Sequence, residues 1–281
     1  MANENELYDP DDSVDQLEED IGSSDFDAAA PQLVVALDHA RYFGKIGGLE
    51  KPYQVLETLI SGNADALMTS YGIIRFYGEE LVSEIPTFMR LDGGYSVYRE
   101  QWLEPTEWRL LHDVETAAEM GVDGVCVMLF MGSEVELETM DIVAKTAAAC
   151  YDTGLTLMVE ALPCPHPRIP DPLAADAMAA ACRLAFEHGA DSVKTYYTGS
   201  VEGFHEVTSN CPVPVLIAGG ARMDSHEAVL DVVHGAMQAG GNGVVFGRNI
   251  WQHPQPAAML DALHCIIHQN GDVSEALQLL Q

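Results

Sequence analysis

The sequence has few basic residues, and lysine is the rarest of them. Lys and Arg together number 13 against 44 acidic residues, so the 281-residue chain carries a formal net charge of −31. Such a field repels the phosphates of nucleic acids and of anionic membranes, which makes both unsuitable partners. Eleven of the acids lie in residues 1–27, which contain no Lys or Arg. We therefore predict that residues 1–28 form an acidic, disordered tail.

Three further features are missing. No apolar run approaches the roughly 18 residues needed to span a bilayer, and the longest obvious one covers only residues 125–131. The first residues show no basic stretch followed by an apolar one, so we expect no secretory signal and a cytoplasmic protein. The six cysteines form no CxxC pair, and we expect no structural disulfides.

Strand-like and helix-like segments alternate along the rest of the chain. Apolar runs predict eight strands, at residues 33–38, 64–70, 86–92, 122–130, 156–162, 191–197, 213–218 and 243–247. Helical patterns lie at residues 52–62, 74–82, 105–120, 135–153, 172–189, 200–209, 224–239, 254–268 and 273–280. Eight strand–helix units predict a single α/β domain over residues 29–281, a (β/α)8 TIM barrel. A doubly wound open sheet is the competitor, but GxGxxG is absent after the first strand.

Polar residues or glycines follow nearly every predicted strand, where the chemistry of such barrels is found. A core built only for stability does not need polar residues at the ends of so many strands. The residues at these strand ends are Asp38 and His39, Thr69 and Ser70, Arg90 and Asp92, Glu160, Lys194 and Tyr196, Gly219 and Gly220, and Gly247 and Arg248.

Lys194 is the most informative of these residues. The chain has four lysines, and only Lys194 lies in an apolar, β-branched run, residues 191–197, that predicts a buried strand. A buried ammonium is costly unless it is paired or loses its proton, and a neutral amine attacks carbonyl groups. A plain salt bridge at a strand end is the structural alternative.

The last two predicted strands suggest a phosphate site. Gly219 and Gly220 end one of them, and Gly247 and Arg248 end the other. Glycines allow the backbone to approach a ligand closely, and a guanidinium fork suits a phosphate. The loops after strands seven and eight of barrels commonly hold a phosphate. Alternatively, the glycines make tight turns and Arg248 pairs with an acid.

Proton transfer beside Lys194 needs a carboxylate, and Asp38 and Glu160 are the candidates. His39 either assists or serves as a structural hydrogen-bond donor. Tyr196 and Tyr197 alternate faces, so we expect at most one at the site and the other in the core. A metal-dependent lyase is a separate hypothesis, with His39, Glu160, Cys164 and His166 around one zinc. No GxSxG or GxxxxGK[ST] motif is present.

These residues resemble the archaeal-type class I fructose-bisphosphate aldolase family, grouped with the deoxyribose-phosphate aldolase-like barrels. The segments that carry the resemblance are 37–39, 193–197, 211–220 and 247–252. Residues 90–94 and 132–134 look similar to the branch that breaks down phosphorylated autoinducer-2, a Schiff-base thiolase. The resemblance implies Lys194 as the Schiff-base lysine, Asp38 as an acid/base residue and the two glycine-rich strand ends as the phosphate site.

The chain departs from that family at two places. Ala40-Arg41 follows the Asp-His pair where the aldolases usually carry glycine. The fifth strand reads Glu160-Ala161-Leu162-Pro163 where the fructose-bisphosphate enzymes have Trp-Ser-Tyr-Pro, whose tyrosine donates a proton. Either Glu160 takes over this proton transfer or the substrate differs from that of the fructose-bisphosphate enzymes, and we expect Glu160 to be catalytic.

The sequence therefore predicts a class I aldolase that acts on a phosphorylated keto sugar or related ketone. No metal and no cofactor are predicted, and Arg90, His39 and Tyr196 are expected to help bind the substrate. The alternatives are a Schiff-base thiolase that transfers an acyl group to coenzyme A, the metal-dependent lyase, and a sugar-phosphate-binding barrel without catalysis. The resemblance also implies a homo-oligomer.

Overall fold

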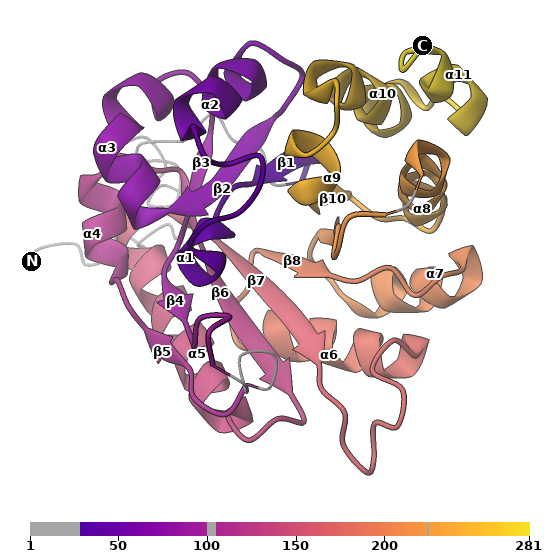
Figure 1. The fold of residues 1–281 in the computed structure, drawn as a ribbon. Helices are drawn as coiled ribbons and strands as arrows, with labels where there is room; N and C mark the ends of the chain where they lie inside the picture. The colour runs from indigo at the N-terminus through magenta and orange to yellow at the C-terminus, as the bar shows by residue number, and fades with distance from the viewer. Residues whose placement is uncertain (1–28, 100–104, 224) are drawn as a thin grey trace, which may run out of the picture.

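The computed structural model describes residues 29–99, 105–223 and 225–281, so the predicted tail lies outside the described residues. Eight parallel strands close into a barrel in the order β1-β10-β9-β8-β7-β6-β3-β2, and helices surround it (Figure 1). The strands are β1 Gln32–Ala36, β2 Ala66–Ser70, β3 Thr87–Arg90, β6 Gly124–Met131, β7 Thr156–Pro163, β8 Ser192–Thr195, β9 Val215–Ala218 and β10 Gly243–Phe246. All eight predicted strands are confirmed.

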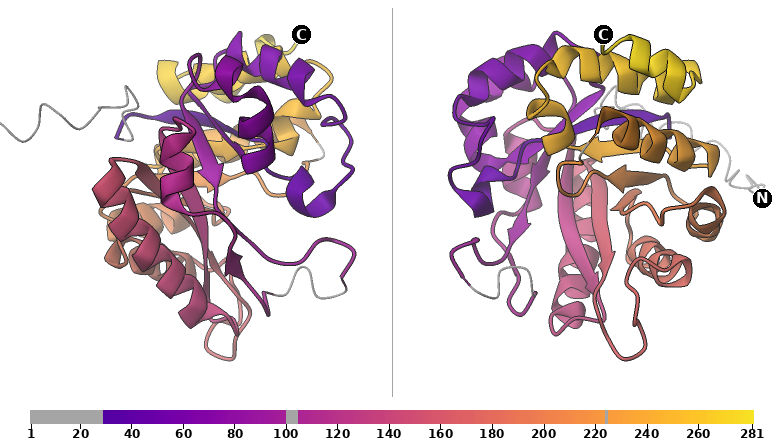
Figure 2. Two further views of the ribbon diagram at one scale, coloured as in Figure 1. Left: turned by 90° about the vertical axis from the view of Figure 1, so that its left-hand side faces the viewer. Right: turned by 45° about the vertical axis from the view of Figure 1, so that its right-hand side comes forward.

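The barrel strands are buried along almost their whole length. Every residue of β6 is buried, as are those of β1, β3, β8, β9 and β10. Parallel strands covered by helices lose water on both faces, which explains why they appear in the sequence as continuous apolar runs. The first and last strands pair side by side and close the barrel, and helix α10, Pro256–Gln269, packs near them (Figure 2).

Helices follow most of the strands. The longer ones begin and end near their predicted limits. Asp272 caps the last one with a full capping box. None of the described helices has the length and apolarity needed to cross a membrane. The helices are α1 Ala40–Phe43, α2 Pro52–Ile60, α3 Tyr71–Leu81, α4 Val114–Glu119, α5 Glu136–Thr153, α6 Ala175–Glu187, α7 Val201–Asn210, α8 His226–Gln238, α9 Arg248–Trp251, α10 Pro256–Gln269 and α11 Val273–Gln278.

The prediction of a helix at 105–120 is wrong for its first half. Residues Arg109–Leu110 form β5, which pairs antiparallel with β4, Asp92–Gly93, outside the barrel. The helix starts only at Val114, where the Asp113 side chain accepts a hydrogen bond from the Thr116 amide. The short ribbon depends on a partner far away in sequence, so a local pattern does not reveal it.

Three aspartates join neighbouring strands at the amino end of the barrel. Each one directly precedes a strand, and its carboxylate accepts a hydrogen bond from a backbone N–H of the strand before it in the chain. This end lies opposite the carboxyl ends of the strands. The pairs are Asp65 with Leu33 at 2.5 Å, Asp123 with Thr87 at 2.8 Å, and Asp191 with Leu157 at 2.7 Å.

Candidate active site

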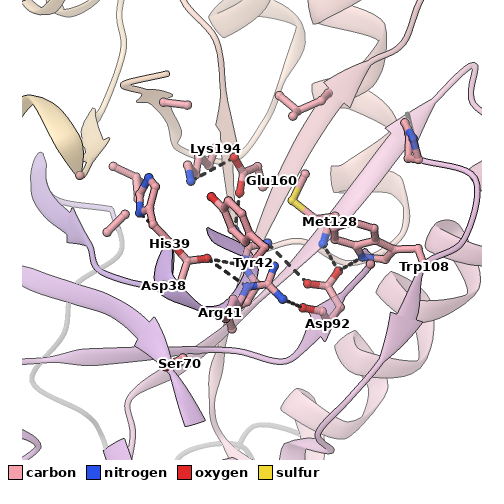
Figure 3. Close-up of a pocket in the computed structure, with 18 of the residues that line it drawn as sticks. Asp38, His39, Arg41, Tyr42, Ser70, Asp92, Trp108, Met128, Glu160 and Lys194 are labelled. Atoms are coloured by element: carbon pink, nitrogen blue, oxygen red, sulfur yellow. Dashed lines mark hydrogen bonds and ion pairs between the residues drawn. The ribbon is translucent and has the colours of Figure 1, made fainter. Parts of the chain in front are cut away.

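A cavity of about 590 Å³ opens at the carboxyl ends of the strands. Side chains from the barrel strands and from the loops that follow them line it (Figure 3). The ten residues that the sequence predicts for the site all belong to this lining. They are Asp38, His39, Arg90, Glu160, Lys194, Tyr196, Gly219, Gly220, Gly247 and Arg248.

Lys194 lies on β8 and is only 7% exposed. The parallel register places Glu160 of β7 directly beside it, so both side chains point into the barrel from the same level. The Lys194 Nζ is 3.0 Å from Glu160 Oε1. The buried ammonium that the sequence predicts therefore has a carboxylate partner in the same cavity.

Glu160 has a second cationic partner, because Arg90 Nη2 donates to its Oε2. Burial by itself would raise the pKa of the Glu160 carboxyl. The positive charges of Lys194 and Arg90 outweigh that effect and hold the pKa below its ordinary value. Glu160 is consequently an ionised carboxylate that lies directly beside the amine of Lys194.

Arg90 is the centre of the charged cluster, and its side chain is 2% exposed. Besides Glu160, it faces Asp38 Oδ2 through Nε at 3.3 Å and Asp92 Oδ1 through Nη1 at 3.6 Å. Burial raises the pKa of Asp38, but the charges around it, led by Arg90, hold the pKa well below its usual range. Arg41 adds another positive charge beside Asp38, with its Nε 3.6 Å from Asp38 Oδ2.

The cluster is electrically balanced when the lysine carries a proton. Three carboxylates, from Asp38, Asp92 and Glu160, face three cations, from Arg41, Arg90 and Lys194. Converting the ammonium of the lysine into an iminium ion keeps one positive charge at this position. The balance is thus preserved during covalent chemistry on the amine, which limits the electrostatic cost of an iminium in a buried site.

His39 is neutral near pH 7. Its burial lowers the pKa to about 4, and its ring packs edge-on against Trp251 with centroids 5.5 Å apart. The two predicted tyrosines divide as expected. Tyr196 lines the cavity, whereas Tyr197 packs on Phe204 at 5.4 Å between centroids.

The predicted phosphate end has one cation with spare donors. Arg248, the first residue of α9, donates from Nη2 to the Gly220 carbonyl at 2.6 Å. It makes no ion pair with any carboxylate of the described residues, and its buried Nε has no partner there. The structural alternative, in which Arg248 pairs with an acid, is therefore wrong for the described part of the chain.

The three glycines at the ends of β9 and β10 are required for different structural reasons. A Cβ at Gly247 would lie 2.5 Å from His39 Cε1, and one at Gly219 would lie 3.0 Å from Phe246. Packing alone thus requires a small residue at these two positions. Gly220 has a φ of +60° and would meet only Tyr196, at 3.7 Å. Its left-handed conformation, together with open space, suits an approach of ligand to the backbone.

The zinc hypothesis finds no support in the arrangement of side chains. No group of three or more His, Cys, Asp or Glu residues in the described ranges is placed to hold a metal ion. His39 and Glu160 line the cavity, while His166 belongs to a short bridge with Ile169 in the loop after β7. The proline-rich segment around Cys164 is therefore not joined to the site as that hypothesis requires.

Several residues of the cavity were not in the predicted site. Arg41 and Tyr42 belong to the short helix α1, and Trp108 lies in the segment predicted as helix. Phe130 and Leu162 lie in apolar strand runs, where sequence alone does not separate core from pocket. Leu162 could have been predicted at the cavity, because it lies two residues after Glu160 and alternate residues of a strand share a face.

A closed parallel barrel with a buried lysine and its carboxylate at the strand ends defines an enzyme of the barrel aldolase class. The agreement extends to sequence. The chain belongs to the DeoC/LacD aldolase family, whose profile matches residues 32–253.

Individual relatives agree with this assignment. A 3-hydroxy-5-phosphonooxypentane-2,4-dione thiolase of Enterobacter sp. (strain 638) is 34% identical over 252 residues, which are 89% of this chain and 80% of that protein. A 2-amino-4,5-dihydroxy-6-oxo-7-(phosphonooxy)heptanoate synthase of Streptomyces griseus is 32% identical over 238 residues, 85% of each chain. An archaeal fructose-1,6-bisphosphate aldolase, solved with its catalytic lysine bound to a carbinolamine intermediate, has the same fold. The TM-score is 0.78, and the two chains are 24% identical, with 86% of this chain and 96% of that one covered.

Proposed function

We propose that this enzyme is a class I aldolase that cleaves or forms a C–C bond in a phosphorylated ketone through an iminium on Lys194. The observation that carries the proposal is the buried Lys194 Nζ, 3.0 Å from an ionised Glu160, in a cavity that also holds Arg248. Two relatives named above act on, or make, compounds with a phosphonooxy group, which supports a phosphorylated substrate.

In the cleavage direction, Glu160 accepts a proton from Lys194, and the free amine attacks the carbonyl carbon of the substrate. The carbinolamine takes this proton back on its oxygen and loses water to give the iminium. Asp38 then accepts the proton of the substrate hydroxyl, the C–C bond breaks, and its electron pair moves into the iminium to form an enamine. The aldehyde fragment leaves, and Asp38 returns its proton to the enamine carbon. Water then attacks the regenerated iminium, which releases the ketone and restores the amine.

Arg248 is proposed to hold the phosphate, with the Gly220 backbone beside it. A charge-assisted contact at a distance from the reacting carbon fixes the position of the carbonyl relative to Lys194. Arg90 is proposed to act through the carboxylates that it binds. His39 and Tyr196 complete the wall of the cavity beside the lysine.

A Schiff-base thiolase is the second candidate, because Leu162 stands where the fructose-bisphosphate enzymes carry their donor tyrosine and because one relative is a thiolase. In that reaction the acyl group leaves to a thiol, such as coenzyme A, instead of leaving as an aldehyde. Formation of a thioester from a phosphorylated dione and coenzyme A would favour the thiolase, and release of free aldehyde would favour the aldolase.

Borohydride trapping tests the mechanism. Reduction in the presence of a phosphorylated ketone should inactivate the enzyme and leave a mass adduct on the peptide that contains Lys194, because an iminium is reduced to a stable amine. Lys194→Met should abolish trapping and turnover, while Lys145→Met, on an exposed lysine of α5, should change neither. An adduct on another lysine, or loss of all activity with a chelator and no adduct, would overturn the proposal.

We also propose a cytoplasmic location, and a homo-oligomeric state, which the resemblance implies. Light scattering coupled to size-exclusion chromatography measures the mass of the particle, and a mass of 30.5 kDa, that of one chain, would contradict the oligomer.

A further inference from the structure

An apolar wall lies one level above the reactive lysine. The register places Met128, Glu160 and Lys194 side by side on β6, β7 and β8. Two residues further along, Phe130 pairs with Leu162. Side chains alternate along a strand, so both point into the same cavity, nearer to its opening. Both belong to its lining.

Trp108 extends this wall and is held rigidly. Its ring meets Phe130 edge-on, with centroids 4.8 Å apart. Its Nε1 donates to Asp92 Oδ2 at 2.7 Å, and the ring lies so close to Gly94 that a Cβ there would be 2.5 Å away. Figure 3 shows Trp108 and Met128 together on one side of the pocket, with His39 on the other. Trp108, Met128, Phe130 and Leu162 are called the apolar wall below.

The charges of the cavity are distributed unequally between its two sides. Its described lining has four side chains with a full positive charge. Arg41 and Arg90 are already bound to carboxylates, and Lys194 is the reacting group. This leaves Arg248, on the side away from the apolar wall, as the cation available to a phosphate. Burying a second phosphate against aromatic and aliphatic side chains would leave its charge uncompensated.

We infer that the substrate is phosphorylated on one side of the reacting carbonyl only, and that its other half is an uncharged, apolar group that packs on the apolar wall. This inference rests on the proposed function and specifies its substrate class. In the synthetic direction, the enamine carbon attacks the carbonyl carbon of an apolar aldehyde and forms the C–C bond. The aldehyde oxygen takes the proton held by a carboxylate, and water then releases the ketone from Lys194.

A chain-length series of aldehydes tests this inference. Dihydroxyacetone phosphate serves as the ketone, and acetaldehyde, propanal, butanal and pentanal serve as acceptors, with glyceraldehyde 3-phosphate as the charged comparison. Each added methylene that packs on the wall should raise kcat/KM about three- to fourfold. Butanal should then exceed glyceraldehyde 3-phosphate. A flat series, or preference for the phosphorylated aldehyde, would overturn the inference.

A matched pair of variants locates the effect. Leu162→Gln places an amide in the apolar wall. In this variant, the factor by which kcat/KM rises with each added methylene should fall from about three- to fourfold to nearly one. Leu137→Gln, on an 80% exposed leucine of α5, should keep the wild-type series. If Leu162→Gln kept that series as well, the wall would not contact the acceptor and the inference would fail. Because the wild-type series alone can refute it, the test does not depend on folding of the variant.

The same samples separate this inference from the proposed function. Borohydride with dihydroxyacetone phosphate alone reports iminium formation without any aldehyde. An adduct on Lys194 combined with a preference for glyceraldehyde 3-phosphate would leave the proposed function standing and refute the apolar acceptor. Absence of both adduct and turnover would overturn the proposed function and the inference together.

Discussion

Replacing Arg90 by methionine removes the guanidinium that three buried carboxylates share. Arg90 faces Asp38 at 3.3 Å and Asp92 at 3.6 Å and also donates to Glu160. Removing one partner from a buried ion pair typically costs about 3–5 kcal/mol, because a desolvated charge is left without compensation. We expect Arg90→Met to lower the free energy of unfolding by about this amount at pH 8, which corresponds to roughly 6–20 °C in Tm.

The loss should depend on pH in a defined direction. Arg90 lowers the pKa values of the Asp38 and Glu160 carboxyl groups, so its removal raises both pKa values. The penalty is then largest at high pH, where these groups are ionised, and becomes smaller as pH falls and they bind protons. Urea denaturation of wild type and variant at pH 8 and pH 5 measures both values. The difference between the two proteins should be smaller at pH 5.

Arg183→Met is the matched control. Arg183 is 52% exposed and pairs with Glu187 on the same helix, and such surface pairs contribute about 0–1 kcal/mol. A loss at Arg90 no larger than that at Arg183, or an equal loss at both pH values, would refute the central role of the Arg90 guanidinium.

The other predictions concern binding, proton transfer and pH. Arg248→Ala should lower kcat/KM for a phosphorylated substrate about 10–150-fold by removing a charge-assisted contact, mainly through KM; steady-state kinetics equal to wild type would contradict the phosphate assignment. Glu160→Gln should slow turnover about 10²–10⁴-fold, while borohydride trapping persists in part; normal turnover would make Glu160 structural. The pKa of His39 is lowered to about 4 in the fold, so the unfolded chain binds this proton first, and stability falls as pH decreases from about 6.5 towards 4. Between pH 8 and pH 5, His39→Gln should lose about 2 kcal/mol less than wild type in urea denaturation; equal losses would show that His39 does not cause this dependence.

The order of the barrel strands was predictable because each strand is an apolar run between recognisable helices. The residues at the strand ends were predictable for the same reason, since a barrel brings those ends together wherever they lie in sequence. This is why Asp38, Glu160, Lys194 and Arg248, which are far apart in the chain, were expected at one cavity and were found there.

The parts that sequence did not reveal depend on partners rather than on local pattern. The pairing of β4 with β5 requires two dipeptides to meet, and it places Trp108 at the cavity. The sharing of Arg90 among three carboxylates is also invisible in sequence, because each partner comes from a different strand end. The role of Leu162 depends on its neighbours Phe130 and Trp108, which only the folded barrel brings together.

The aspartates at the amino end of the barrel have a consequence for how the fold comes apart. Asp65, Asp123 and Asp191 tie β1 to β2, β3 to β6 and β7 to β8. Six of the eight strands are thus grouped in pairs, each fastened by a side chain at the face remote from catalysis. Partial opening is therefore expected to release strands two at a time, so that amides within one pair exchange with solvent together. These three aspartates and the reactive groups lie at opposite ends of the barrel. Substitutions at the amino end can therefore change the unfolding rate of the barrel without changing the residues that contact the substrate.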